Sequence, residues 1–513
     1  MTETKSATQK GAWLLLATFL VAVASLIYEL IAATLSSYLL GDSVRQFSFV
    51  IGVFLSAMGL GAYLSRFVGA ALAGFVWAQI TLGIVGGFLA PVIYFAYAFL
   101  GDITVPLYLL LALIGVLSGM EIPLIARVLE DIGVRQFRFE NVLTVDYVGA
   151  LIASIAFPLL IIPHLGLMSA SLAFGCLNLG VAGLSLLIFR DSTTRTMKVS
   201  WGVAMAASIG ALVMAERMVS VVDANLFEDD VILSETTPYQ QITITRFRER
   251  TRLFLDHAIQ FDTLDEHRYH EALVHPAMAS APRRAHVLIL GGGDGMATRE
   301  VLRYDDVQSV TLVDLDPRVT ELFREHPDLA PLNGGSLSDP RVNIVAADAW
   351  RFLDETGKQF DVIILDLPDP KNIALSKLYS LEFYALLVER MTAQGVATTQ
   401  AGSPLFAQDA FWSIARTLEE TRNPVQPGEG LFVTPYHTYV PSFGDWGFVM
   451  ASVAPLAARD LPLPDGLEYL TAAEWQAAQS FSRDIDRTDA EPNSIQDHVL
   501  SGYYQAGWDA WFQ

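Results

Sequence analysis

Four acidic side chains in the second half of the chain each come where a short apolar segment ends or turns. The segments are 287–290, 310–313, 342–345 and 362–365, and the acids are Asp294 in the loop Gly291–Gly295, Asp314, Asp348 and Asp366. The carboxyl ends of parallel strands form the ligand-binding edge of an open α/β sheet, so these acids are expected around one site. Asp314 can accept both ribose hydroxyls, and Asp348 is placed to contact an adenine edge. The ordered set predicts an S-adenosyl-type nucleotide site rather than a degenerate Rossmann-like domain.

The elements that must position these acids alternate between strands and helices. A helical pattern follows the glycine loop, so this region has the order strand, glycine loop, helix. Upstream, residues 232–246 and 252–261 alternate apolar and polar side chains, which predicts a small antiparallel β region. We expect an α/β Rossmann-like, methyltransferase-type domain at 281–455, preceded by the β region at 223–280.

The first 222 residues differ in composition from the rest. They hold 11 basic and 11 acidic residues, so the net charge of −22 lies entirely in the remainder of the chain. An acidic domain repels nucleic acid and attracts cations, although an ordinary solvated acidic surface has the same composition. Apolar residues make up 52% of the chain and charged residues only 17%, which favours a membrane protein.

Seven apolar segments in residues 1–222 are long enough to cross a bilayer as helices. They are 12–40, 46–68, 72–100, 103–129, 141–163, 166–189 and 200–222. The last is the weakest because it meets Glu216 and Arg217. The first lacks a cleavage site before a soluble domain, so it is expected to be a retained span. The fold class expected for the whole chain is therefore an α-helical membrane bundle of about seven spans fused to the α/β domain.

Three acids lie deep in these apolar segments, namely Glu29, Glu121 and Asp146. Tyr28 and Tyr147 adjoin two of them. Intramembrane carboxylates are costly and usually face a bundle interior or a wet cavity. They predict a membrane acidic site for a cationic amine or a proton relay. The alternative is that protonated carboxyl groups hydrogen-bond between helices or lie near helix ends. Gly52, Gly59 and Gly61 predict close helix packing in the second segment.

From about residue 220 to 450 the sequence resembles the spermidine synthase family. The resemblance rests on motifs in the family's order: TPYQQI, LDHAIQ, DEHRYHEALVH, GGGDG, LVDLD, AADA, DLPDP, KLYSLEFY, QAGSP and WGF. The first half resembles the multi-span segment fused to some bacterial members. The resemblance implies transfer of an aminopropyl group from decarboxylated S-adenosylmethionine to putrescine or a related amine. The products would be spermidine or an analogue and methylthioadenosine.

The resemblance also implies roles for individual residues. Asp314 would hold the ribose and Asp348 the adenine, while Asp294 and Asp366 would face the terminal ammonium of the donor. The other expected donor-binding residues are Gln240, Gln260, His270, Gly291, Gly293 and Gly295. The expected acceptor-binding residues are Tyr239, Asp366, Asp369, Gln400, Phe443 and Trp446. Asp366 is the expected general base, with Tyr269 and Asp369 orienting the amine. The alternative for Asp369 is a turn acid before Pro370.

Asp294 separates aminopropyl transfer from methyl transfer. A methyltransferase must accept the carboxylate of S-adenosylmethionine, which two acids would repel, whereas the decarboxylated donor ends in an ammonium. Displacement at a carbon next to a sulfonium needs no metal and no further cofactor. The acceptor ammonium, with a pKa of about 10.4 by the lysine model, must first lose a proton. The lone Cys176 excludes an intrachain disulfide and a cysteine metal site.

The match to the family breaks on the acceptor side. Leu367-Pro368 stands where the family has small hydroxylic residues, and the loop 440–445 is shorter and lacks the family's tyrosine. Putrescine is the expected acceptor, with cadaverine, a shorter diamine or spermidine left open. Residues 456–513 extend past the match and are expected to be a packing tail. The alternative function is a polyamine transport or sensing protein whose second domain only binds.

The expected location is a bacterial inner membrane, crossed several times. Basic residues between the apolar segments favour a cytoplasmic N-terminus, and seven full crossings would then place the second domain outside. A cytoplasmic pool of the S-adenosyl donor favours a cytoplasmic catalytic domain, which is the expectation adopted. The expected partners are small cationic amines, the lipid bilayer and further copies of the chain in a homo-oligomer, with no nucleic acid.

Overall fold

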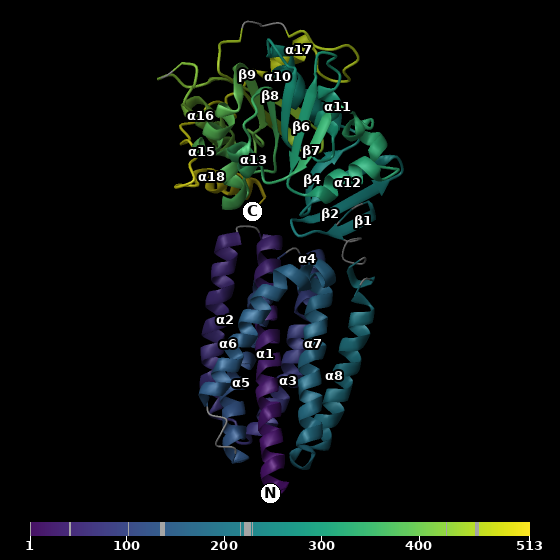
Figure 1. Ribbon diagram of the computed structural model, residues 1–513, viewed down its shortest axis with the longest axis vertical. Helices are drawn as coiled ribbons and strands as arrows, with labels where there is room; N and C mark the ends of the chain where they lie inside the picture. The colour runs from purple at the N-terminus through teal and green to yellow at the C-terminus, as the bar shows by residue number, and fades with distance from the viewer. Residues whose placement is uncertain are drawn as a thin grey trace. The chain divides into compact units, whose positions relative to one another are not determined.

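The protein divides into two compact units, residues 1–231 and 232–513 (Figure 1). The computed structural model describes residues 2–40, 43–100, 102–133, 139–215, 217–219, 227, 229–426, 428–456 and 461–512. The predicted boundary between residues 222 and 223 lies outside the described residues. Each unit has its own hydrophobic clusters, and each is described here by itself.

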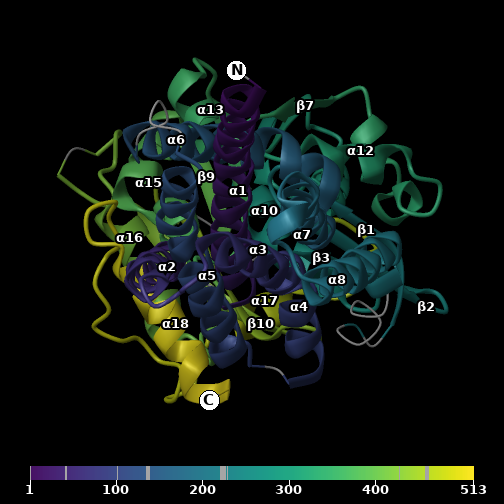
Figure 2. The same ribbon diagram turned by 90° about the horizontal axis from the view of Figure 1, so that it is seen from below.

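The described residues of unit 1 form mainly helices joined by short turns. Its longer helices are α1 (Thr2–Leu40), α2 (Ser43–Ser65), α3 (Ala71–Gly87), α4 (Leu89–Leu100), α5 (Thr104–Asp131), α6 (Phe139–Ala156), α7 (Ile162–Ile188) and α8 (Arg195–Val213). A π-helical turn, η1 (Phe157–Ile161), joins α6 to α7, and a short 3-10 turn, η2 (Arg190–Ser192), precedes α8. Figure 2 shows this unit from the end at which the chain begins.

Six helical stretches among the described residues have the length and apolar composition needed to cross a membrane. One of them, Glu140–Ile188, contains two of the seven predicted segments. At about 1.5 Å per residue it is far longer than one bilayer crossing requires. Gly166 lies within it at a φ of +65°, outside the helical region. In the last predicted segment, α8 ends at Val213 and helical residues follow at Ala215 and 217–219. Residues 216 and 220–222 of this segment lie outside the described residues.

Helix α1 packs against α2, α5, α6 and α7, and α2 packs closely along α5. A Cβ atom on Gly61 would lie 2.0 Å from the carbonyl oxygen of Val116, so the prediction of close packing is confirmed at this glycine. The same prediction is wrong for Gly52 and Gly59, which face open space. The facing glycine is instead Gly119 of α5, whose added Cβ would lie 2.0 Å from the carbonyl oxygen of Met58.

Unit 2 contains two sheets. The smaller has the order β1-β2-β3-β4, from β1 (Asp230–Thr236), β2 (Gln241–Phe247), β3 (Arg250–Leu255) and β4 (Ala258–Asp262). The larger has the order β10-β11-β9-β8-β5-β6-β7, from β5 (His286–Gly291), β6 (Ser309–Asp314), β7 (Val342–Ala346), β8 (Phe360–Asp366), β9 (Met391–Gln400), β10 (Phe432–Val440) and β11 (Gly444–Ser452). Strands β5 to β9 are parallel, and β10 and β11 are antiparallel additions.

Helices cover both faces of the larger sheet (Figure 1). They include α10 (Glu266–Ser280), α11 (Met296–Val301) and α12 (Pro317–Glu325) on one face, and α13 (Ala349–Glu355), α15 (Leu381–Glu389), α16 (Gln408–Glu420) and α18 (Val499–Phe512) on the other. Along β5, Val287 and Ile289 belong to one cluster while Leu288 and Leu290 belong to the other. Side chains alternate along a strand, so a continuous apolar strand supplies both cores. The predicted Rossmann-like architecture and small antiparallel sheet are confirmed.

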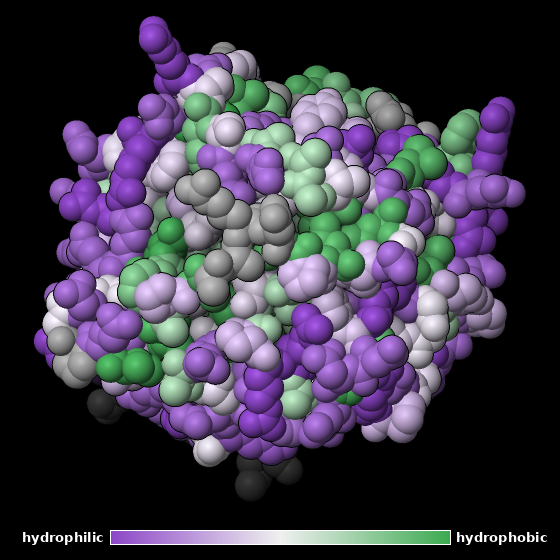
Figure 3. All heavy atoms as spheres, turned by 90° about the horizontal axis from the view of Figure 1, so that it is seen from above, coloured by the Kyte–Doolittle hydropathy of each residue, from purple (hydrophilic) through white to green (hydrophobic). Residues whose placement is uncertain are grey.

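The surface of unit 2 visible in Figure 3 is mainly hydrophilic, with small scattered hydrophobic areas. The hydrophilic character of this face is consistent with the larger share of charged residues in the second part of the sequence.

A buried carboxylate holds the C-terminal segment against the sheet domain. Glu271 of α10 is 1% exposed, and its oxygens accept hydrogen bonds from the backbone N–H groups of Glu468 (2.7 Å), Tyr469 (2.9 Å) and Leu470 (2.7 Å). Three donors on one carboxylate replace the water that the buried group has lost.

We expect Glu271→Gln to lower the unfolding free energy of unit 2 by about 2 kcal/mol, because an amide NH2 group would then face backbone donors. Thermal unfolding of the detergent-solubilised full chain measures the effect. Glu355→Gln, which alters an exposed ion pair with Arg351, is the matched control and should change little. Equal melting temperatures for the two variants would contradict the anchoring role.

Candidate active site

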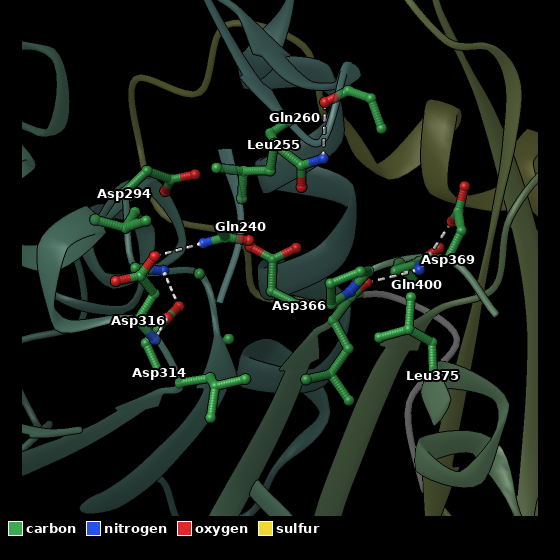
Figure 4. A pocket seen from close by; sticks show the side chains of 18 of the residues that line it. Gln240, Leu255, Gln260, Asp294, Asp314, Asp316, Asp366, Asp369, Leu375 and Gln400 are labelled. Carbon is green, nitrogen blue, oxygen red and sulfur yellow. Dashed lines mark hydrogen bonds between the residues drawn. The ribbon is translucent and has the colours of Figure 1, made fainter. Parts of the chain in front are cut away.

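A cavity of about 310 Å³ opens at the carboxyl edge of the parallel strands. Figure 4 shows Asp294, Asp314 and Asp316 on one side of it, Asp369, Gln400 and Leu375 on the other, and Asp366 between them. Strands β5 and β8 are neighbours here, although the chain passes through β6 and β7 between them. Ligands of open α/β sheets bind at such a switch point.

The glycine loop brings the chain past β8 at very short range. Gly291 has a φ of +80°, and a Cβ atom there would lie 2.0 Å from the carbonyl oxygen of Asp366. Gly293 donates its backbone N–H to Asp314 Oδ2 at 3.0 Å. Gly291 and Gly293 therefore line the cavity as predicted. Gly295 caps the start of α11, packs toward Leu337 and is not among the lining residues, so it shapes the loop rather than facing the cavity.

The Asp314 carboxylate sits at the end of β6, where the backbone N–H of Asp316 donates to its Oδ1 at 2.9 Å. Burial raises the pKa of Asp314 to about 6, opposed by the two backbone hydrogen bonds. Gln240, in the turn between β1 and β2, donates Nε2 to Asp316 Oδ2 at 3.1 Å and so reaches the same side. Tyr239, predicted to bind the acceptor, precedes Gln240 in the same turn and lies on the Asp316 side of the cavity.

Asp348 begins helix α13 and lines the cavity next to Ala347 and Ala349. One carboxylate oxygen accepts the backbone N–H of Arg351 at 3.0 Å, and the other lies 3.7 Å from Lys377 Nζ. The helix-capping bond therefore uses Oδ1, while Oδ2 pairs with the half-exposed Lys377. Gln260 also lines the cavity, from β4.

The cavity brings together four ionisable groups, Tyr269, His270, Asp294 and Asp366, and Glu266 pairs with the histidine from behind the lining. Tyr269 donates its hydroxyl to Asp366 Oδ1 at 2.8 Å, and His270 Nδ1 lies 2.8 Å from Glu266 Oε2. Burial raises the pKa of Asp366 and raises that of Asp294 to about 6, in both cases against the opposing charge of His270. Burial lowers the pKa of His270, but the hydrogen bond and charge of Glu266 outweigh it and raise the pKa to about 9.

The far side of the cavity is organised around Asp369. Its Oδ1 accepts Gln400 Nε2 at 3.1 Å, and its Oδ2 accepts the Tyr504 hydroxyl at 2.7 Å. Burial raises the pKa of Asp369. An aromatic wall adjoins this side, where the ring centroid of Phe443 lies 5.7 Å from that of Tyr269 and 5.1 Å from that of Trp446. Asp369 therefore faces the cavity and is more than a turn acid before a proline.

The structure gathers almost all of the predicted site residues of unit 2 around one cavity. Those that line it are Tyr239, Gln240, Gln260, Tyr269, His270, Gly291, Gly293, Asp294, Asp314, Asp348, Asp366, Asp369, Gln400, Phe443 and Trp446. Polar residues that the sequence analysis did not assign to the site also line it, among them Asp256, Asp316, Lys371 and Tyr504. Asp256 and Asp316 lie within motifs already quoted and Lys371 directly follows DLPDP, so their proximity was a usable signal. Nothing local marks Tyr504. The C-terminal segment packs on the domain as expected, and it also contributes Tyr504 to the cavity.

The three acids of the apolar segments belong to unit 1 and are placed unequally. Glu121 is 5% exposed, and its Oε1 accepts Gln79 Nε2 at 2.6 Å. Asp146 is partly buried and interacts electrostatically with Glu121. Glu29 is partly buried, and its neighbour Tyr28 is fully buried and accepts Asn178 Nδ2 at 3.1 Å. Tyr147 is 65% exposed and makes no part of this interior.

We expect Asp294→Asn to stabilise the ligand-free protein above pH 6 by an amount on the order of 2 kcal/mol. The pKa of Asp294 is raised by folding, so the native state loses stability as pH rises through about 6, where the buried carboxyl must ionise. Asparagine avoids this ionisation. The melting-temperature difference between variant and parent should be positive at pH 8 and vanish near pH 4, and a pH-independent difference would contradict the assignment.

Comparison with known proteins shows the family to which the chain belongs. Residues 266–460 match the model of the spermine/spermidine synthase domain. The polyamine aminopropyltransferase of Leptospira interrogans is 40% identical over 97% of this chain and 98% of its own length. Polyamine aminopropyltransferase 2 of Ralstonia nicotianae is 41% identical over 97% of this chain and 98% of its own.

A crystal structure of spermidine synthase in complex with the transition state analogue AdoDATO superposes with a TM-score of 0.45 at 26% identity, covering 49% of this chain and 85% of that one. The two relatives, each about 40% identical along almost the entire chain, establish the family of this protein. The chain belongs to the spermidine synthase family and is an aminopropyltransferase.

Proposed function

We propose that the cavity binds decarboxylated S-adenosylmethionine and transfers its aminopropyl group to putrescine or a closely related diamine. The observation that carries this proposal is charge. Seven aspartates line the cavity against one lysine and one histidine. The donor has a cationic sulfonium and a terminal ammonium, and the acceptor is a cationic amine, so both substrates supply the positive charge that this cavity lacks.

The donor would extend from the Asp314 side to the centre. Asp314 would hold the ribose hydroxyls, Asp348 would face the adenine edge, and Gln240 would help to fix the nucleoside. Asp294 and Asp366 would receive the ammonium end of the aminopropyl group. S-adenosylmethionine itself would bring a carboxylate to these buried acids, and like-charge repulsion in a region of low dielectric disfavours it.

The reaction is a displacement at the carbon attached to the sulfonium. The amine nitrogen forms a new C–N bond, the C–S bond breaks, and its electron pair returns to sulfur to give methylthioadenosine. The nucleophile needs a lone pair, so one proton must leave the acceptor ammonium. Asp366 is the proposed acceptor of that proton, because burial raises its pKa and Tyr269 fixes its orientation. Holding both substrates in line supplies a large part of the rate.

The test is release of methylthioadenosine by the purified protein supplied with decarboxylated S-adenosylmethionine and a panel of amines. We expect turnover with a diamine and a loss of about 1,000-fold or more in kcat for Asp366→Asn. Asp328→Asn, which changes an exposed ion pair with Arg246, serves as the matched control. Amine binding without turnover would favour a transport or sensing protein, and turnover with S-adenosylmethionine would favour methyl transfer.

We further propose that unit 1 is a multi-pass bundle in a bacterial inner membrane and that the catalytic domain faces the cytoplasm, where its donor is made. Helical stretches of suitable length and a neutral, apolar composition support the membrane location. The buried pair of Gln79 and Glu121, with Asp146 nearby, supports a role for the bundle in delivering or sensing amines. We also propose that the chain forms a homo-oligomer, which the family resemblance implies.

Neutralising Glu29, Glu121 and Asp146 together, as Glu29→Gln, Glu121→Gln and Asp146→Asn, should reduce polyamine flux in proteoliposomes by about 10-fold, because the cationic amine loses its intramembrane counter-charges. Turnover by the solubilised protein should stay within about twofold of the parent. Glu140→Gln, at an exposed position near the start of α6, is the matched control. Unchanged amine binding and flux in the triple variant would refute this role.

A further inference from the structure

The C-terminal helix α18 reaches into the cavity although it lies outside the matched family domain. That domain ends at residue 460, whereas Tyr504 lies in the middle of α18. The Tyr504 hydroxyl donates to Asp369 Oδ2 at 2.7 Å, and the residue lines the cavity. A side chain 135 positions away in the sequence therefore contacts the carboxylate on the far side from Asp294 and Asp314 (Figure 4).

Asn493 fastens the segment before α18 to one wall of the cavity. It is fully buried, and its Nδ2 donates to the carbonyl oxygens of Ser376 (2.9 Å) and Tyr379 (3.3 Å). Its own backbone carbonyl accepts the N–H of Leu381 at 2.9 Å. Helices α14 (Ile373–Ser376) and η5 (Lys377–Tyr379) contribute Leu375 and Leu378 to the cavity lining, so Asn493 joins the C-terminal segment to the lining itself.

Helix α18 itself also packs closely against the segment that contains Phe406 and Ala407. A Cβ atom on Gly507 would lie 2.6 Å from Ala407 Cα, so the helix backbone lies directly on this segment. The Trp508 ring centroid lies 5.0 Å from that of Phe406 and 6.0 Å from that of Tyr504. These contacts restrict the position of Tyr504, because this half-buried aromatic cluster cannot shift without losing its packing.

The Asp369 carboxylate has the properties of a site for one ammonium group. Both of its oxygens take hydrogen bonds from neutral donors, Gln400 and Tyr504, and it makes no ion pair among the described residues. Asp366, the proposed base, is three residues earlier in the chain, so a second carboxylate lies a short way along the cavity. A diamine that presents one nitrogen to Asp366 has its other nitrogen available for Asp369.

We infer that Tyr504 of α18 closes the acceptor end of the cavity, positions Asp369 for the distal ammonium of the amine, and thereby limits the length of the amine that the enzyme accepts. This inference rests on the proposed function and names the element that selects its acceptor. The acceptor loop 440–445 is short and lacks the tyrosine expected from the family resemblance, and Tyr504 supplies a phenol to this side from a different part of the chain. Tyr504 is a positioning and specificity residue and takes no proton from the substrate.

Two substitutions separate the hydroxyl from the ring. Tyr504→Phe keeps the wall and removes the donor to Asp369, so KM for putrescine should rise about 10-fold while kcat changes less than about threefold. Tyr504→Ala removes the wall, so the preference for putrescine over cadaverine or spermidine, as a ratio of kcat/KM, should fall about 10-fold. KM for decarboxylated S-adenosylmethionine should be unchanged in both variants.

Tyr503→Phe is the matched control, because Tyr503 adjoins Tyr504 in α18 but contacts the backbone N–H of Glu491 and does not line the cavity. All variants are compared by thermal unfolding to confirm an intact fold. Unchanged amine KM in Tyr504→Phe together with unchanged length preference in Tyr504→Ala would overturn the inference. If the unaltered protein released no methylthioadenosine with any amine, the proposed function itself would be overturned. The two failures are therefore distinguishable.

Discussion

Several carboxylates are held at one edge of a parallel sheet with too few cationic side chains to neutralise them. Asp294, Asp314, Asp366 and Asp369 all lie where burial raises the pKa of a carboxyl group. Such an arrangement costs stability unless a ligand brings positive charge. The glycine loop, the tyrosine on Asp366 and the histidine beside Glu266 all serve to hold these groups in fixed positions, so the site is organised before its cationic substrates arrive.

The two ends of the cavity are built in different ways. The proposed donor end is local, because the glycine loop and Asp314 each follow directly from a strand of the parallel sheet. The proposed acceptor end is assembled from distant segments, since Asp369 follows β8, Gln400 ends β9 and Tyr504 belongs to the last helix. A domain of this kind can therefore keep the same nucleotide-binding residues while the residues of the proposed acceptor end change with the surrounding loops and extensions.

The helical unit also buries polar side chains among apolar ones. Gln79 with Glu121 and Tyr28 with Asn178 are side-chain pairs between helices that are otherwise apolar. In the bilayer proposed for unit 1, such pairs would satisfy polar groups that lipid cannot, and the proposed role of the bundle in holding or passing a cation would use them. Close glycine contacts between α2 and α5 bring the backbones near enough for helices of this composition to associate.

The sequence by itself determined the strands, the helices and the donor half of the site, because periodicity, glycine loops and acids at strand ends are local signals. It identified Asp294, Asp314 and Asp366 together because parallel strands end at a common edge. Only the tertiary structure decided that Gly295 turns away from the cavity, that Gly61 but neither Gly52 nor Gly59 meets a neighbouring helix, and that Tyr504 reaches Asp369. Each of these depends on how distant elements dock, and the packing of a helix against a segment some hundred residues away leaves no pattern in the residues nearby.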